Sequence, residues 1–203
     1  LEKIFLARDR VGEKPLYYTN SDKGLAFSSE IKAILSDTNF SRNVNLDALN
    51  YYLTYGSTNG SSSIFTGLNK VRPGEVVIYC LKKNSLTKRK YWELPKFNKE
   101  SEKEPKYVLE KVKCLLVDSV KRQLVADVPV GIFLSGGLDS SLITAIAAQV
   151  SGKPLNTYTV SFPGEKKFDE SSHASLIASH FDTNHEVLEM GPFNISILYE
   201  LAK

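Results

Sequence analysis

Cysteine and long hydrophobic runs are scarce in this 203-residue sequence, and each absence argues against a class of protein. The two cysteines, Cys80 and Cys114, lie far apart in apolar surroundings, which indicates buried reduced thiols rather than a disulfide or a metal-binding pair. No apolar run approaches the ~18 residues of a membrane span, and no signal-peptide pattern opens the chain. We therefore expect a cytoplasmic protein without a membrane partner.

The sequence also lacks a large excess of charge of either sign, because 26 Lys and Arg residues are balanced by 23 Asp and Glu residues, for a net charge of +3. This balance is too small to predict a nucleic-acid partner. One basic group could be a nucleic-acid surface, but we favour a solvated hairpin loop whose lysines protect a sheet edge: Lys82, Lys83, Lys88, Arg89 and Lys90.

Three familiar catalytic or nucleotide-binding patterns are also missing. The chain contains neither a G-x-x-x-x-G-K-[ST] loop nor a G-x-G-x-x-G dinucleotide fingerprint. A G-x-S-x-G nucleophile elbow would need glycine where Phe133 stands. P-loop, Rossmann and serine-hydrolase sites are therefore not indicated.

Two patterns divide the chain into two predicted domains. Residues 1–94 contain short apolar runs, first KIFLAR, PLYYT and GLAFSS, that indicate an antiparallel α+β meander, with a short helix capped by Ser28 or Ser29. Residues 95–105, PKFNKESEKEP, have charge and proline but little apolar character, which is typical of a linker. Residues 106–203 alternate helix and strand, which predicts an α/β domain with a parallel sheet.

The most informative stretch is VGIFLSGGLDSSLITAIAAQ, residues 130–149, where a predicted buried strand at 130–134 meets a helix predicted at 140–150. A parallel strand feeding a helix places the free N–H groups of the first helical turn, and the positive end of its dipole, beside the strand's carboxyl end. Gly136 and Gly137 would let the backbone wrap closely around a bulky anion.

Polar side chains in the same stretch extend this prediction. Ser135, Ser140 and Ser141 could donate hydroxyl hydrogen bonds to the anion. Asp139 would repel a bare phosphate, so its presence suggests a cation between the two, most simply Mg²⁺. The alternative is a helix cap that happens to be rich in glycine and serine. We favour a phosphate-binding loop.

The string SGGLDSS resembles the pyrophosphate-binding loop of the N-type ATP pyrophosphatases, which transfer AMP from ATP to a substrate oxygen and release pyrophosphate. Over almost the whole chain, successive strings look like those of the glutamine-hydrolysing asparagine synthetases: ARDRVGEKPLYY, LAFSSEIKAIL, SIFTGLNKVRPGE, ADVPVGIFLSGGLDSSLITA, TYTVSF and FDESSHASLIASHFDTNHEV. In that family a class II glutaminase of the N-terminal-nucleophile type releases ammonia, and a synthetase domain adenylates the aspartate side chain. Ammonia then displaces AMP.

The resemblance implies domain identities and binding residues. Residues 1–94 would be the rear part of the glutaminase domain, and residues 106–203 the front part of the ATP pyrophosphatase domain. Asp139 would hold Mg²⁺, and Leu134 and Val160 would contact adenine. The alternative for these two is plain core at strand ends, and both interpretations can hold together. The implied nucleotide-binding residues are Leu134, Ser135, Gly136, Gly137, Leu138, Asp139, Ser140, Ser141 and Val160.

Several family features do not occur in this sequence. The family's nucleophile is an N-terminal cysteine, whereas this chain starts at Leu1, and the family's second Ser-Gly-Glu-Gly-Ser-Asp-Glu type loop is missing. We therefore expect a piece of a longer protein that by itself hydrolyses no glutamine. No catalytic residue is assigned.

Two smaller departures lie near the last predicted strand. His173 replaces the usual tyrosine, and Asp182 replaces a glycine at a helix C-terminus, where a left-handed conformation is expected. A metal site formed by His173, His180 and His185 is conceivable, but polar helix surface is the favoured interpretation.

Two rival functions stay open at this point. One is a relative that amidates a different carboxylate, such as a sugar acid in surface polysaccharide synthesis. The other is a non-catalytic remnant that still binds nucleotide. For the favoured function we expect only small-molecule partners, namely glutamine, aspartate and ATP, and a homodimer is left open.

Overall fold

The computed structural model describes residues 2–96, 104–164 and 169–191. The chain divides into two compact units, Leu1–Asn98 and Lys99–Lys203. Most of the predicted linker and the helical pattern predicted at the end of the chain lie outside the described residues. Within the described ranges, no helix is both long and apolar enough to cross a membrane.

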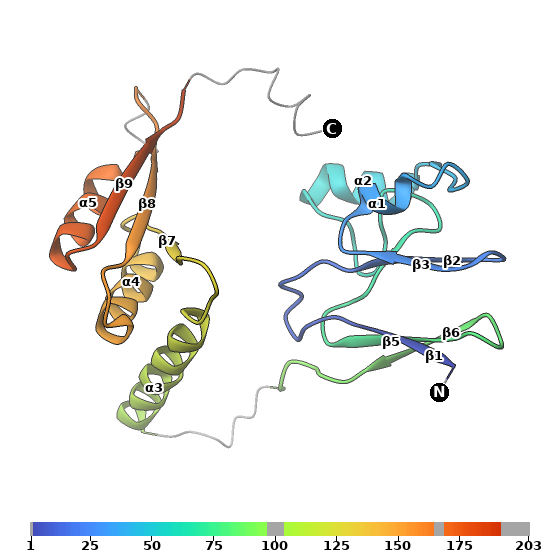
Figure 1. Cartoon of the computed structure of the whole chain (residues 1–203), viewed down its shortest axis with the longest axis horizontal. Helices are drawn as coiled ribbons and strands as arrows, with labels where there is room; N and C mark the ends of the chain where they lie inside the picture. The colour runs from blue at the N-terminus through green and yellow to red at the C-terminus, as the bar shows by residue number, and fades with distance from the viewer. Residues whose placement is uncertain (1, 97–103, 165–168, 192–203) are drawn as a thin grey trace. The chain divides into compact units, whose positions relative to one another are not determined.

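The first unit contains two three-stranded antiparallel sheets and two short helices (Figure 1). One sheet has the strand order β1-β5-β6 and the other has the order β3-β2-β4. The elements are β1 (Lys3–Ala7), β2 (Tyr17–Ser21), β3 (Gly24–Ser28), α1 (Ile31–Leu35), α2 (Leu46–Tyr55), β4 (Asn69–Lys70), β5 (Glu75–Cys80) and β6 (Ser85–Lys90). The predicted meander is wrong at its first strand, because β1 pairs with β5 rather than with β2.

The core of this unit explains that pairing. Leu6 of β1 and Val77 of β5 form one buried cluster with Tyr18 of β2 and Val71, which follows β4. Pairing β1 with β5 aligns Leu6 with Val77 in register, so both side chains lie on the same face of the sheet. Burial of these apolar side chains is the main contribution of the strands to the stability of this unit.

The two helices of the first unit begin differently. At the start of α2 the Asn45 side chain accepts a hydrogen bond from the Ala48 N–H, and Gly56 ends this helix with φ of 71°. Helix α1 is not capped by a serine, because its N-cap is Glu30 and the Ser28 hydroxyl instead accepts from the Glu30 N–H at 3.0 Å. The prediction that five basic residues lie in the hairpin loop is wrong, since of these five only Lys82 and Lys83 lie in the turn and the other three lie on β6.

The second unit has a three-stranded parallel sheet with the order β7-β8-β9. Its elements are α3 (Pro105–Gln123), β7 (Gly131–Phe133), α4 (Leu138–Ser151), β8 (Asn156–Ser161), α5 (Ser171–His180) and β9 (Asn184–Glu189) (Figure 1). The predicted change from antiparallel to parallel pairing is therefore confirmed. Because all three strands run the same way, their carboxyl ends lie along one edge of the sheet.

The strand before the glycine loop is less buried than predicted. Leu134 is 1% exposed and packs with Ala174 and Ala178 of α5, whereas Phe133 is 77% exposed. Side chains alternate across a strand, so β7 directs one residue into the core and the next away from it. Both cysteines are free, but neither is buried as predicted: Cys80 is half-buried on β5, and Cys114 is exposed on α3, which carries no buried residue in the described structure.

Asp182 ends α5 in the left-handed conformation that the sequence predicts, with φ of 49°. The Asp182 N–H donates to the Ser179 carbonyl and the Thr183 N–H to the Ala178 carbonyl, which is the Schellman arrangement. We expect Asp182→Gly to raise the free energy of unfolding by about 1 kcal/mol, because glycine adopts this conformation without steric cost. Chemical denaturation of both proteins checks this. Asp182→Val, the opposite control, should be destabilising, and an Asp182→Gly protein no more stable than the parent would contradict the prediction.

Candidate nucleotide-binding site

A closed network of hydrogen bonds fixes the loop between β7 and α4. The Ser140 hydroxyl donates to the Gly137 carbonyl at 3.2 Å and accepts from the Ser135 N–H at 3.3 Å. The two serine hydroxyl oxygens are 3.0 Å apart, so the proton between them comes from Ser135. The Gly137 N–H donates to the Ser135 hydroxyl at 3.2 Å. Ser135 and Ser140 therefore use their hydroxyl protons to brace the loop.

The first turn of α4 presents backbone donors next to this braced loop. Its N-cap, Gly137, supplies no side-chain cap, and the first intrahelical bond runs from the Ser141 N–H to the Gly137 carbonyl. The N–H groups of Leu138, Asp139 and Ser140 precede that bond and so have no intrahelical acceptor. Together with the positive end of the helix dipole, they form an environment that favours an anion.

The two glycines of the loop serve different purposes. Gly136 has φ of 78°, and a Cβ there would lie 2.6 Å from the His173 Cβ and 2.8 Å from the Ala174 backbone nitrogen. The turn and the close packing of α5 therefore both require glycine at this position. Among the described residues, a Cβ on Gly137 would have only the Ser135 hydroxyl within 4 Å, at 3.2 Å. The fold hardly needs glycine at 137, so the open space there is available to a ligand.

Asp139 is the predicted magnesium residue, and it lies exposed in the first turn of α4. Proteins commonly hold Mg²⁺ with one or two carboxylates plus the phosphates of the substrate, and a lone carboxylate beside a phosphate-binding loop fits that pattern. Among the described residues, no group of three or more His, Cys, Asp and Glu side chains could hold a metal. Any Mg²⁺ at this loop would thus take most of its remaining ligands from phosphate oxygens and water.

The conceivable histidine site is not formed within the described ranges. His173 and His180 are exposed on α5, as predicted for polar helix surface. His185 differs, because it is half-buried on β9 with its Nδ1 2.9 Å from the Thr157 hydroxyl. The contact of His185 with Thr157 on the neighbouring strand indicates a role in packing the sheet.

A cavity of about 360 Å³ adjoins the loop at the carboxyl ends of β7 and β8. The structure brings three predicted binding residues together here, since Leu134, Ser135 and Val160 all line the cavity. The Leu134 side chain is core, and its carbonyl accepts a short hydrogen bond from the buried Thr159 hydroxyl, whereas Val160 is 37% exposed. The remaining lining residues, which were not predicted as binding residues from the sequence, are Phe133, Tyr158, Thr159, Phe162 and Glu170.

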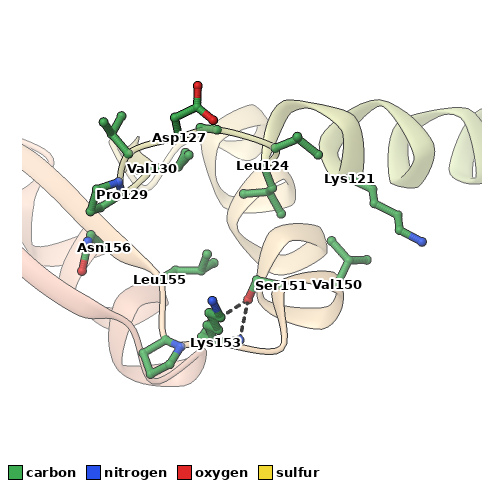
Figure 2. Close-up of a pocket in the computed structure, with 14 residues that line it drawn as sticks. Lys121, Leu124, Asp127, Pro129, Val130, Val150, Ser151, Lys153, Leu155 and Asn156 are labelled. Carbon is green, nitrogen blue, oxygen red and sulfur yellow. Dashed lines mark hydrogen bonds between the residues drawn. The ribbon is translucent and has the colours of Figure 1, made fainter.

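A larger cavity of about 640 Å³ lies at the amino ends of β7 and β8, away from the loop (Figure 2). The C-terminal ends of α3 and α4 border it, and these carry the negative ends of the helix dipoles. In Figure 2 the Ser151 hydroxyl donates to the Lys153 carbonyl and accepts from the Lys153 N–H. None of the predicted binding residues lines this cavity, so we do not assign it to a nucleotide. Its lining includes Lys121, Leu124, Val130, Val150, Lys153 and Leu155.

Comparison with known proteins gives two family matches, one for each unit. Residues 1–92 match the glutamine amidotransferase domain, and residues 111–199 match asparagine synthase.

Similar proteins from several organisms match across most of this chain. A putative asparagine synthetase [glutamine-hydrolyzing] 2 of Methanocaldococcus jannaschii is 37% identical, over 90% of this chain and 35% of its own. Asparagine synthetase [glutamine-hydrolyzing] 3 of Bacillus subtilis is 40% identical, over 83% of this chain and 28% of its own. Amidase chry2 of Gibberella zeae is 33% identical, over 85% of this chain and 26% of its own. The chain thus spans roughly a third or less of the length of these curated relatives.

Proposed function

Because this chain belongs to the family of glutamine-hydrolysing asparagine synthetases, we propose that it is part of an ATP-dependent ligase that converts aspartate to asparagine. Residues 106–203 would contribute the front part of the adenylating domain. Residues 1–94 would contribute the rear part of the domain that releases ammonia from glutamine, with residues 95–105 as the linker. The observation that carries the proposal is the braced loop before α4, with its open helix N-terminus and its adjoining cavity.

The proposed binding mode follows from the charges and surfaces at this edge of the sheet. The pyrophosphate of ATP would lie against the N–H groups of Leu138, Asp139 and Ser140, where the helix dipole is favourable. The nucleoside would occupy the apolar cavity beside Leu134 and Val160. The glycine at 137 leaves the space through which the phosphate chain approaches the backbone. Ser135 and Ser140 would act by holding the loop in shape.

The chemistry requires stabilisation of negative charge on a leaving group. An oxygen of the aspartate side-chain carboxylate attacks the α-phosphorus, the bond between the α-phosphorus and its bridging oxygen breaks, and pyrophosphate leaves. Backbone N–H groups already oriented at the loop would stabilise the charge that builds up on the pyrophosphate. Asp139 would hold Mg²⁺, which supplies further neutralisation of that charge when bound. Ammonia then attacks the acyl carbon, AMP leaves, and the nitrogen loses a proton.

A second function is favoured by one comparison. Similarity to Amidase chry2 extends over 85% of this chain, so similar sequence also occurs in a protein that is named an amidase. We therefore retain the alternative that the acceptor carboxylate is not aspartate, with a sugar acid as one example. A remnant that binds nucleotide without turnover is the third alternative.

Exchange of labelled pyrophosphate into ATP tests these alternatives in the complete gene product. We expect exchange that depends on aspartate, because adenylation is reversible and forms pyrophosphate. Exchange with another carboxylic acid but not with aspartate would assign a different acceptor. ATP binding without exchange for any acid would assign the remnant. The predicted cytoplasmic location, the homodimer left open and the expected lack of glutaminase activity in these 203 residues alone stay predictions.

A further inference from the structure

The cavity beside the glycine loop is largely apolar, but it contains a carboxylate. Phe133, Tyr158, Val160 and Phe162 offer aromatic and aliphatic surface, which suits a planar base. Among the described residues that line this cavity, Glu170 is the one with a charged side chain. An ionised carboxylate only accepts hydrogen bonds, so it restricts what a ligand presents there.

The Glu170 carboxylate is not committed to the fold. Glu170 occupies the N-cap position of α5, yet its side chain makes no capping hydrogen bond. The preceding residue does so instead, because Asp169 Oδ1 accepts from the Ser171 N–H at 3.0 Å. The Ser171 hydroxyl and N–H hold the pKa of the Asp169 carboxyl below its usual value. Among the described residues, the exposed Glu170 side chain has no hydrogen-bond or ion-pair partner.

Glu170 lines the cavity one helical turn before the point where α5 contacts the phosphate loop. The Ala174 N–H donates to the Glu170 carbonyl at 3.1 Å, so the two residues are one helical turn apart. Ala174 is also where α5 touches the loop, since a Cβ on Gly136 would lie 2.8 Å from its nitrogen. A nucleotide with phosphates at the loop and base in the apolar part of the cavity places its ribose beside this helix end.

We propose that Glu170 accepts hydrogen bonds from the ribose hydroxyls of the bound nucleotide and so selects ribonucleotides, an inference that rests on the proposed function. ATP offers two kinds of hydrogen-bond donor, the ribose hydroxyls and the amino group of adenine. With the phosphates at the loop and the base in the cavity, the ribose is the part of ATP next to the start of α5, so we assign its hydroxyls to Glu170. The negative charge of Glu170 also disfavours phosphate in the cavity, which fixes the direction of binding. Carboxylates read ribose hydroxyls in the same way in dinucleotide-binding folds.

Equilibrium binding to the complete gene product tests this assignment. The ligands are ATP, 2′-deoxy-ATP, 3′-deoxy-ATP and inosine triphosphate, measured with the parent and with Glu170→Gln. Because a hydrogen bond to a charged group is involved, we expect the parent to bind ATP about 10- to 100-fold more tightly than at least one deoxy analogue. Glu170→Gln should lose that preference and bind ATP correspondingly more weakly. Discrimination against inosine triphosphate alone, lost in the variant, would overturn the ribose assignment.

Controls separate this inference from the function on which it rests. Glu110→Gln removes an exposed carboxylate on α3 and should leave every affinity unchanged. Unfolding midpoints of the parent and Glu170→Gln should differ only by the small helix-dipole contribution of one exposed carboxylate, because the Glu170 side chain makes no capping hydrogen bond. If the parent binds ATP and Glu170→Gln keeps full affinity and full discrimination between the analogues, the role of Glu170 alone is wrong. A parent that binds no ATP overturns the proposed function and this inference with it.

Discussion

Gly137→Val is expected to abolish ATP-dependent adenylation in the complete gene product while leaving the protein folded. The valine side chain would fill the space beside the first turn of α4, where the phosphate chain is proposed to contact the backbone. We expect pyrophosphate exchange to fall by ~10³ or more, since the oriented N–H donors could no longer reach their ligand. The measurements are exchange rates and ATP affinity, with circular dichroism melts on the same samples.

Gly137→Val should be tolerated by the fold. Gly137 has φ of −69° and ψ of 163°, extended backbone that valine adopts readily. Its Cβ would require only a small movement of the Ser135 side chain, so the expected loss is about 1 kcal/mol for replacing an N-cap glycine. ATP binding at parental affinity by the folded variant would show that the loop is not the phosphate site.

Gly136→Ala is the matched control, because the neighbouring glycine is required by the fold itself. Its positive φ and the 2.6 Å approach to the His173 Cβ leave no room for a methyl group. We expect a loss of at least ~2 kcal/mol in the free energy of unfolding, from backbone strain and from displacement of α5. The two substitutions should therefore have different effects: Gly137→Val mainly lowers activity, and Gly136→Ala mainly lowers stability.

Asp139→Asn is expected to lower the adenylation rate by ~10²–10³ with little change in stability. The substitution keeps the size of the side chain but removes the charge that is proposed to hold Mg²⁺ against the pyrophosphate. Raising the Mg²⁺ concentration should recover part of the lost rate, because a weakened metal site fills at higher concentration. Pyrophosphate-release kinetics across a Mg²⁺ titration provide the measurement.

A second acidic residue offers a closely matched control for Asp139. Asp47 lies exposed in the first turn of α2, just as Asp139 lies in the first turn of α4. Each carboxylate interacts favourably with its helix dipole, worth about 0.3–1 kcal/mol, so both asparagine variants should lose similar stability. Only Asp139→Asn should lose activity. If Asp139→Asn melts like the parent and releases pyrophosphate at the parental rate, the proposed magnesium role is wrong.

The sequence alone determined the features that depend on neighbouring residues. Strand and helix alternation predicted the parallel sheet, and Asp182 marked a helix end in the left-handed conformation. The string SGGLDSS predicted the strand, turn and helix N-terminus, because backbone preferences and capping act over a few residues. These signals are local, and they survive in the folded chain.

Tertiary structure alone decided which distant residues meet. Strand β1 pairs with β5 because that register buries Leu6 against Val77, and no local preference distinguishes β5 from β2 as its partner. The strict need for glycine at 136 comes from α5, which begins more than thirty residues later in the chain. Glu170 enters the cavity because parallel strands bring their carboxyl ends to one edge. Contacts of this kind depend on the packing of whole elements, which residue patterns in the sequence do not specify.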